Sequence, residues 1–462
     1  MTKSANKIVT LNILSTILLQ GIAFFTVPIF TRMLGADQYG AYSVFFSWVG
    51  ILTSLMGLGV PSTLAAGRYE FKDSYYEFRS SILLFSTFIS LIILTMGSIF
   101  IHPISKWLGY SELLVILVYL ASFSNCIIGF IQNACTYEKR ADINLVISIF
   151  LSLSSPGLSI YLIHYFKDSE KFMGRVYGTV IPYGIVAVVL WIVFFKKKPT
   201  GLHLSYCRFG LTVGVPVVFH SLAQNILSQS DRVMMQRMGI ERSEIGIYSL
   251  FYTLSSVLSI VLNALNTSWC PFYYDDLDTR SDDRLKRKCK NYVELFTILT
   301  CGFLMFSREV SYILADDSYR TGIDVIPMIV ISVYFTFMYQ FPVNFEFFHK
   351  KTNVIALGTL GAAMVNFLLN YIMIPLWGMY GAALATALAY GALFLLHYWI
   401  VTHKLPVRFH LNAVVFLPGL IVVSLGIVIF YTLAEACYIR WGIGVLLGVY
   451  ELARIFERKT IF

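Results

Sequence analysis

Polar residues gather on one face of an otherwise apolar stretch at residues 210–234, and this face continues to residue 236. At about 100° per residue they fill roughly 160° of the helix circumference. They are His220, Gln224, Asn225, Ser228, Asp231, Arg232 and Gln236, while Gln229 and Ser230 interrupt the apolar side. A helix embedded in hydrocarbon must turn such a face toward protein or water, because each unpaired polar group there costs several kcal/mol. The face predicts either the lining of a polar cavity or hydrogen bonds to neighbouring helices. For Asp231 and Arg232, a solvated helix end is a further alternative.

A milder polar face follows residues 9–31. Asn12 and Gln20, together with Ser15, Thr16 and Thr26, fall within an arc of about 140°. We predict that Asn12 and Gln20 line the same cavity. Small polar residues also join helices within membranes, so contact between helices is the alternative for this stretch.

Three arginines could bind an anion. Arg32 and Arg237 stand at the ends of two apolar stretches, and Arg68 stands at the end of another. A guanidinium group can bind two oxygens of a phosphate at once, which predicts an anion site. The alternative is that these arginines anchor the helices at the membrane interface. Glu346 is first interpreted as an interfacial charge, and alternatively as a carboxylate that couples transport to protons.

Motifs for metal, cofactor or nucleotide chemistry do not occur. The eight histidines form no HExxH, the seven cysteines form no CxxC, and no GxxxxGK[ST] occurs. We therefore predict no metal site, no cofactor and no direct use of ATP.

The composition excludes a soluble protein. Hydrophobic residues make up 57% of the 462 residues and charged residues 13%, against about 45–50% and about 25% in soluble domains. The bilayer is therefore a partner. The net charge of +9 is spread over short connections, so it does not indicate nucleic acid. The first apolar stretch exceeds the ~7–15 residues of a signal-peptide core, and we expect it to stay as the first membrane span.

Fourteen stretches are candidates for the ~20 apolar residues that a spanning helix needs. They cover residues 9–31, 41–66, 81–103, 113–134, 143–166, 173–195, 210–234, 245–272, 291–313, 322–345, 354–375, 381–402, 412–433 and 441–455. With both termini in the cytoplasm, 24 of the 35 Lys and Arg residues fall on the inner side, as the positive-inside rule requires. No connection is long enough for a soluble catalytic domain.

Three pairs of similar short motifs (echoes), about 206 residues apart, indicate an internal repeat. Arg-Met-Leu-Gly at 32–35 returns as Arg-Met-Gly at 237–239, and Gly-x-Tyr-Ser at 40–43 returns at 246–249. A third echo pairs residues 174–184 with 381–391. Each copy holds six segments, an even number, so both copies have the same orientation. We expect two pseudo-symmetric six-helix lobes, residues 1–200 and 201–405, around a central cavity, and two additional helices in residues 406–462.

The motifs resemble those of a known family. They are the run from Pro28 to Gly35 with Tyr39-Gly40, Gly57-Leu58-Gly59 with Arg68-Tyr69, Asn366-x3-Asn370, and Gly378-x2-Gly381-Ala382-Ala383-x-Ala385-Thr386. This pattern is similar to that of oligosaccharide flippases, the Wzx-type branch of the multidrug/oligosaccharidyl-lipid/polysaccharide exporter superfamily. The resemblance implies a bacterial inner-membrane protein that flips undecaprenyl-diphosphate-linked repeat units for lipopolysaccharide O-antigen, capsule or exopolysaccharide. It also implies the polysaccharide polymerase machinery as a partner.

Two other classes of function stay open. Within the superfamily, the chain could be a cation-coupled drug antiporter or a peptidoglycan-precursor flippase. Acidic residues deep in the helices would favour an antiporter, and they are sparse here. A membrane-embedded polysaccharide polymerase or acyltransferase is the alternative from another class, and the short outer loops together with the duplication argue against it.

Overall fold

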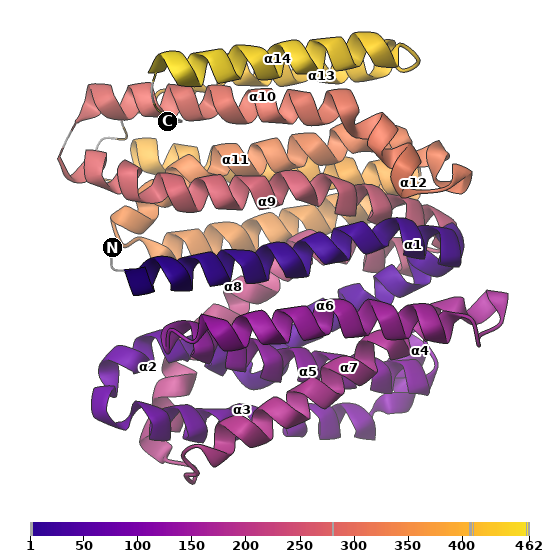
Figure 1. Cartoon of the computed structure of the whole chain (residues 1–462), viewed down its shortest axis with the longest axis vertical. Coiled ribbons are helices and arrows are strands. Elements are labelled where there is room, and N and C mark those ends of the chain that lie inside the picture. Colours follow the sequence, from indigo (N-terminus) through magenta and orange to yellow (C-terminus); the bar gives the residue numbers. More distant parts are fainter. Residues whose placement is uncertain (1–2, 280, 406–408, 410, 459, 461–462) are drawn as a thin grey trace. The chain divides into compact units, whose positions relative to one another are not determined.

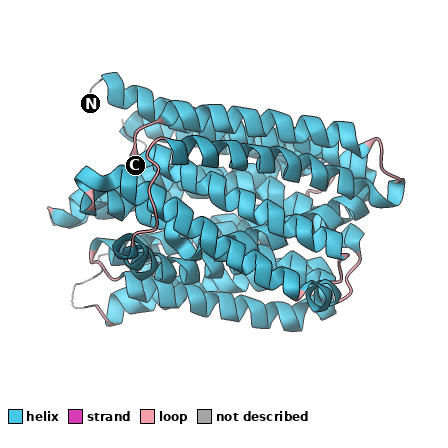
Figure 2. Ribbon diagram, turned by 90° about the horizontal axis from the view of Figure 1, so that it is seen from below, coloured by secondary structure: helices cyan, strands magenta, loops and turns pink. Residues whose placement is uncertain are grey.

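The computed structural model of the chain is helical wherever it has regular structure (Figure 2). It describes residues 3–279, 281–405, 409, 411–458 and 460, and the side chains of these residues except 3–20 and 23. The chain divides into two compact units, Met1–Gly246 and Ile247–Phe462. This boundary lies in the first turns of one helix, α9, whereas the repeat predicts a division at residue 200, which stays a prediction.

The first unit contains, among its described residues, the eight helices α1 to α8. They are α1 (Lys3–Leu55), α2 (Leu64–Glu70), α3 (Tyr75–Ile99), α4 (Ile101–Leu108), α5 (Glu112–Tyr137), α6 (Ala141–Ile163), α7 (Lys171–Lys196) and α8 (Leu204–Arg237). The 3-10 segment η1 (Met56–Thr63) follows α1 directly. These helices are drawn from indigo to pink in Figure 1.

The second unit begins within α9 (Arg242–Asp278) and runs to the end of the described chain. Its other elements are α10 (Asp282–Leu314), η4 (Asp317–Val325), α11 (Ile326–Phe348), α12 (Thr352–His403), η5 (Ala413–Val415), α13 (Leu417–Thr432) and α14 (Cys437–Arg458).

Two helices each combine two of the predicted spans. Residues 9–31 and 41–66 are joined through α1 and η1, and residues 354–375 and 381–402 are joined through α12. Each long helix breaks at a glycine, Gly35 with φ 66° and Gly378 with φ 54°. Glycine adopts this left-handed region without steric cost, so the chain changes direction there without a loop.

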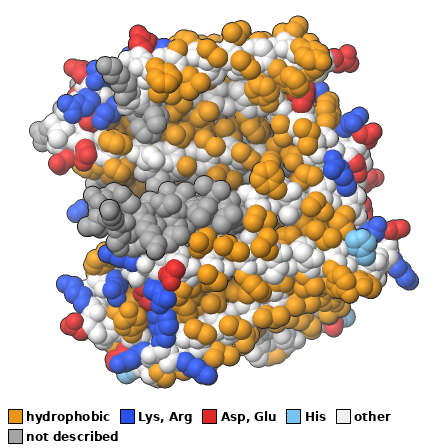
Figure 3. Space-filling model, in the orientation of Figure 1, with side chains coloured by type: hydrophobic (Ala, Val, Ile, Leu, Met, Phe, Trp, Pro, Cys, Tyr) orange, Lys and Arg blue, Asp and Glu red, His pale blue; other side chains and the backbone are white. Residues whose placement is uncertain are grey.

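Ten helical segments of the described chain are long and apolar enough to cross a membrane. Their surfaces agree with this: Figure 3 shows hydrophobic side chains covering the visible sides of each unit, with charged side chains gathered near the helix ends. Large apolar side chains such as Leu153, Val188, Leu368 and Leu425 are exposed. In water this would be unfavourable, but in hydrocarbon it is the expected outer surface.

Repeat-related glycines bring two helix starts into contact in the first unit. Gly35 and Gly239 both have positive φ, 66° and 78°. The segments after them pack backbone to backbone, since a Cβ atom on Gly40 would lie 1.9 Å from the Arg242 carbonyl oxygen and one on Gly246 would lie 2.0 Å from that of Ala36. Only glycine permits this approach, which accounts for the first two sequence echoes.

The third echo serves a similar purpose in each unit. A Cβ atom on Gly174 of α7 would lie 2.7 Å from the Ile163 backbone of α6. Its counterpart Gly381 would place a Cβ atom 2.1 Å from the Met373 carbonyl oxygen across the break in α12. In both units the glycine opens a helix that packs closely against the preceding one.

Two ionic clusters attach α14 to α10. At one end the buried Arg440 pairs with Glu309, and its guanidinium nitrogens also donate to the carbonyl oxygens of Leu433 at 2.9 Å and Met305 at 3.1 Å. At the other end Arg458 pairs with Glu294. A buried arginine with this many acceptors is fully satisfied, so the helix is held without an uncompensated charge.

Candidate functional site

The polar side of α8 is hydrogen-bonded to the second half of α1. Asn225 Nδ2 donates to Ser54 Oγ at 2.7 Å. One turn further, Gln229 Oε1 accepts from Ser47 Oγ at 3.2 Å. Gln229 thus joins the polar contacts, although the helical periodicity placed it at the edge of the apolar side. The predicted alternative of bonds between neighbouring helices holds for Asn225.

His220 and Gln224 lie on the same side of α8, one turn apart. Both are half-buried. Within the described part of the chain, neither side chain makes a hydrogen bond with the protein, whereas Asn225 next to them does. They therefore keep hydrogen-bonding capacity for a ligand. Asn225 keeps some as well, because its bonds to Ser54 and to the Ser221 carbonyl oxygen both use Nδ2 and leave Oδ1.

Asp231 and Arg232 are buried, with 0% and 6% of their surfaces exposed. Arg232 donates to the Ser228 carbonyl oxygen at 3.0 Å and to Gln229 Oε1 at 3.3 Å. A solvated helix end is therefore wrong for this pair. Helix α8 continues to Arg237, and the two charged groups are enclosed by protein.

The three candidate arginines differ in their surroundings. Arg237 is exposed, its guanidinium lies 5.3 Å from the Trp107 ring centroid, and it donates to the Trp107 carbonyl oxygen at the end of α4. Arg32 is exposed as well. Arg68, half-buried, lies over the Tyr75 ring at 4.7 Å. Stacking of this kind fixes the direction of a guanidinium group while leaving other donors available.

Asn12 and Gln20 belong to α1, but their side chains lie outside the described residues. Their predicted place in a cavity stays a prediction.

Glu346 is buried against a histidine. Its carboxylate Oε2 lies 2.7 Å from His397 Nδ1, and both side chains are 0% exposed. The ring of Tyr339 packs edge-on at 5.2 Å from that of His397, and a Cβ atom on Gly358 would lie 2.2 Å from His397 Nε2. Glu346 is therefore enclosed by protein and not solvated, whereas its interfacial depth stays a prediction. An enclosed carboxylate–imidazole pair can hold or pass a proton.

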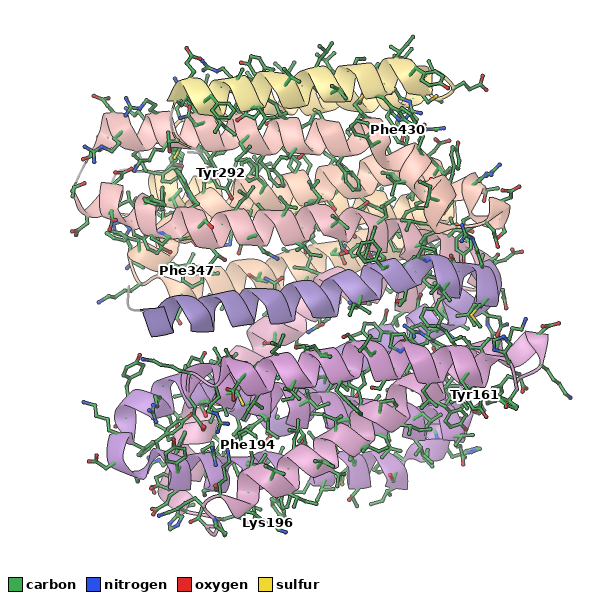
Figure 4. The ribbon with its side chains drawn as sticks, viewed as in Figure 1. Tyr161, Phe194, Lys196, Tyr292, Phe347 and Phe430 are labelled. Carbon is green, nitrogen blue, oxygen red and sulfur yellow. The ribbon has the colours of Figure 1, made fainter. Side chains whose placement is uncertain are left out.

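Sequence analysis missed a second buried ion pair, Arg79 with Glu138. Arg79 NH1 lies 2.7 Å from Glu138 Oε1, and the side chains are 1% and 5% exposed. The guanidinium also donates to the Phe194 carbonyl oxygen at 3.1 Å and stacks on the Phe194 ring, which Figure 4 labels near the end of α7. The positive-inside count alone includes Arg79 among the inner charges. The sequence signal for its burial is its position two residues before the predicted span 81–103.

Helices α5 and α11 end in the same way. Lys139 and Lys350 follow these helices with φ values of 60° and 58°. The next residue in each case donates its N–H to a carbonyl oxygen five residues back, Arg140 to Cys135 at 2.7 Å and Lys351 to Glu346 at 2.9 Å. The two buried pairs therefore stand at corresponding helix ends, with a permanent cation in the first unit and a titratable imidazole in the second.

Arg175 lies inside the first unit, although the positive-inside count alone leaves it with the outer charges. Its guanidinium lies 3.6 Å from the Phe30 ring centroid and 5.1 Å from that of Tyr42, and it donates to Ser159 Oγ at 3.1 Å. The sequence signal was its position two residues inside the predicted span 173–195. The residue joins α1, α6 and α7 near the segment that carries Arg32.

The model of the polysaccharide biosynthesis protein family matches residues 6–274, more than half of the chain. The chain belongs to this family. The match agrees with the resemblance to oligosaccharide flippases, and it places the chain with transporters rather than enzymes.

Curated relatives are distant. A Lsg locus protein of Haemophilus influenzae is 25% identical over 269 residues, which span 55% of this chain and 62% of that protein. An uncharacterized membrane protein of the same organism is 22% identical over 74% of this chain and 84% of its own length. A Haloferax volcanii protein named "Probable low-salt glycan biosynthesis flippase Agl15" is 19% identical over 85% of this chain and 83% of its own.

Solved structures of transporters share the fold. The structure of the lipid II flippase MurJ in an inward closed conformation matches with a TM-score of 0.74 at 15% identity, over 97% of this chain and 99% of that one. An inward-facing MATE family multidrug resistance transporter of the MOP superfamily matches with a TM-score of 0.60 at 15% identity, over 88% and 94%. The prediction of an all-α, multi-pass membrane protein with this superfamily's fold is confirmed.

Proposed function

We propose that this protein is a flippase that moves polyprenyl-diphosphate-linked oligosaccharide repeat units across the bacterial inner membrane for surface polysaccharide biosynthesis. The family match over residues 6–274 carries this proposal. The fold shared with the lipid II flippase MurJ supports it. The undecaprenyl carrier, the O-antigen, capsule or exopolysaccharide destination and the polymerase partner belong to the same proposal.

The proposed mechanism is alternating access between two repeat-related lobes, residues 1–200 and 201–405, with two further helices after them. It implies fourteen membrane crossings with both termini in the cytoplasm. Reporter fusions test this topology. Fusions at Tyr76, Lys197 and Asp282 should report the cytoplasm, and fusions at Asp168 and Asp317 the periplasm. An exported C-terminus would contradict the even number of crossings.

Residues of the first unit supply groups of the right chemistry. The half-buried His220 and Gln224 offer hydrogen bonds for sugar hydroxyls, because the protein leaves them unpaired within its described part. The exposed Arg32 and Arg237 offer guanidinium groups for the diphosphate. Arg68 would attract the anion at the cytoplasmic end. The charges of Asp231 and Arg232 would contribute to the electrostatic potential that the substrate meets along α8.

Glu346 with His397 is the proposed coupling site. An ionisable pair enclosed among membrane helices is costly to keep and indicates a function. The pair lies close to the end of α11, where a short path to water would let it exchange a proton.

The second candidate function is flipping of a peptidoglycan precursor. The TM-score to the lipid II flippase, 0.74, is higher than that to the drug transporter, 0.60. Expression in a strain lacking its surface-polysaccharide flippase separates the two. Restored export of the polysaccharide supports the proposal, whereas rescue only of a strain depleted of its lipid II flippase would favour the second function.

A further inference from the structure

A cavity of about 930 Å³ lies within the second unit, between α10, α13 and α14. Its walls are mainly apolar and include Val293, Ile298, Val422 and Leu447. Tyr292, which Figure 4 labels, lies on α10 next to the lining residue Val293. This volume is in the range of small-molecule binding sites. Neighbouring residues of α13 and α14, such as Ile421 and Val449, are apolar and exposed, so the cavity borders a surface that faces hydrocarbon.

Two lysines form one edge of the cavity. Lys286 and Lys290 are one turn apart on α10, and both are exposed. No carboxylate of the described residues forms an ion pair with either of them. Residues at i and i+4 share a face of a helix, so both ammonium groups can reach the same anion.

The acidic residue that lines the cavity is already paired. Glu294 pairs with Arg458 and with Arg454, and it accepts a hydrogen bond from the Tyr450 hydroxyl at 2.9 Å. Arg458 also lies 3.7 Å from Glu451. Arg454 also pairs with Glu457 at 2.8 Å. Three carboxylates therefore engage the two guanidinium groups, and with the two lysines this cluster keeps one net positive charge at the edge of an apolar cavity.

Most polar groups in the walls beyond the lysines are already engaged. Tyr450 donates to Glu294, and Asn412 Oδ1 accepts from the Val414 N–H at 3.5 Å. The Thr297 hydroxyl is occupied, donating to the Val293 carbonyl oxygen at 2.6 Å and sharing a hydrogen bond with the Tyr334 hydroxyl at 2.8 Å. Sugar hydroxyls placed there would lose their hydrogen bonds to water without replacement. Lysine, moreover, is a point charge without the planar fork that selects a diphosphate.

We propose that this cavity binds an anionic phospholipid of the cytoplasmic leaflet, with its phosphate on Lys286 and Lys290 and its acyl chains along α13 and α14. Basic pockets between membrane helices on the cytoplasmic side have this chemistry. Only the choice of leaflet rests on the topology proposed above. Such a lipid would join the last two helices to α10 and thereby fill a space that would otherwise cost packing energy.

Native mass spectrometry of the purified full-length chain tests the site by titration with phosphatidylglycerol, phosphatidylcholine and undecaprenyl phosphate. Each lysine near the surface should contribute about fivefold, so Lys286→Gln with Lys290→Gln should weaken phosphatidylglycerol binding about thirty-fold. The matched control, Lys350→Gln with Lys351→Gln, removes two exposed lysines outside the cavity and should leave binding unchanged. Val422→Trp, which fills the cavity from a partly exposed position, should weaken binding of all chain-bearing lipids.

Equal loss of phosphatidylglycerol in both lysine pairs would show general charge attraction and overturn the site. A second result would also overturn the site. If undecaprenyl phosphate binds more tightly than phosphatidylglycerol, and Lys286→Gln with Lys290→Gln abolishes that binding, the occupant is the carrier lipid. The readout is binding alone, so failure here leaves the proposed flipping activity untouched, and loss of flipping activity leaves the lipid site untouched.

Discussion

The hydrogen bond between Asn225 and Ser54 allows the two interpretations of the α8 polar face to be separated. Asn225→Ala and Ser54→Ala each remove the same bond of 2.7 Å, but only Asn225→Ala also removes an amide from the polar face. Hydrogen bonds between membrane helices contribute about 0.6 kcal/mol on average. Against a total stability of about 5–15 kcal/mol, either change should leave the protein folded and inserted.

Export should distinguish the two variants. If Asn225, with His220 and Gln224, contacts the saccharide, loss of one such contact of about 1.4 kcal/mol slows flipping roughly tenfold. We therefore expect Asn225→Ala to lower export about tenfold and Ser54→Ala to lower it less than twofold. His220→Ala, which breaks no hydrogen bond of the described protein, should act like Asn225→Ala.

The assay is the amount of lipid-linked repeat units that accumulate on the cytoplasmic face of a strain lacking its own flippase, at matched protein level. Thermal unfolding of the purified variants in detergent checks stability. Equal loss of export from Ser54→Ala and Asn225→Ala would refute the reasoning, because the amide would then serve only to join α8 to α1. Leu222→Ala with Ile226→Ala, on the other side of the helix, should act mainly through stability.

The remaining predictions concern charged groups. Arg32→Gln and Arg237→Gln should each reduce export severely and the lysine variants only partly, because lysine lacks the planar fork; full complementation by lysine would indicate that both residues only anchor the helices. His397→Phe should destabilise the purified protein by about 3–5 kcal/mol, since it leaves the buried Glu346 without its partner, and a thermal scan that shows no shift would show that Glu346 does not depend on His397. Glu346→Gln keeps an acceptor for His397 and should leave stability nearly unchanged while it removes the dependence of export on the proton gradient; retained dependence would exclude this pair as the coupling site.

The sequence predicts the helices well because hydrocarbon imposes one length and one composition on each span. Residues 354–375 and 381–402, for example, both fall in α12, and the short interval between them contains the break at Gly378. The internal echoes are also readable, because close backbone contact at Gly40 and Gly246 requires glycine whatever the surrounding sequence.

Charged residues near the ends of spans were predicted poorly. Arg79, Arg175 and Glu346 all stand where hydropathy also allows a solvated loop, and each is enclosed by protein. Their hydrogen-bond and ring partners lie 16 to 145 residues away in the sequence, so no local pattern identifies those partners. The polar face of α8 was found by periodicity, but its partners Ser47 and Ser54 on α1 depend on how the helices pack, which a single sequence does not specify.

Reconstitution tests the central claim most directly. The purified protein is inserted into liposomes that carry a polyprenyl-diphosphate-linked oligosaccharide with a fluorescent sugar, and a membrane-impermeant quencher reports how much of it lies in the outer leaflet. We predict that the protein makes the inner-leaflet pool accessible to the quencher, and that Arg32→Gln with Arg237→Gln slows this exchange at equal protein content. Exchange no faster than in protein-free liposomes, from a protein that is folded and exchanges a different substrate such as a drug cation, would contradict the account.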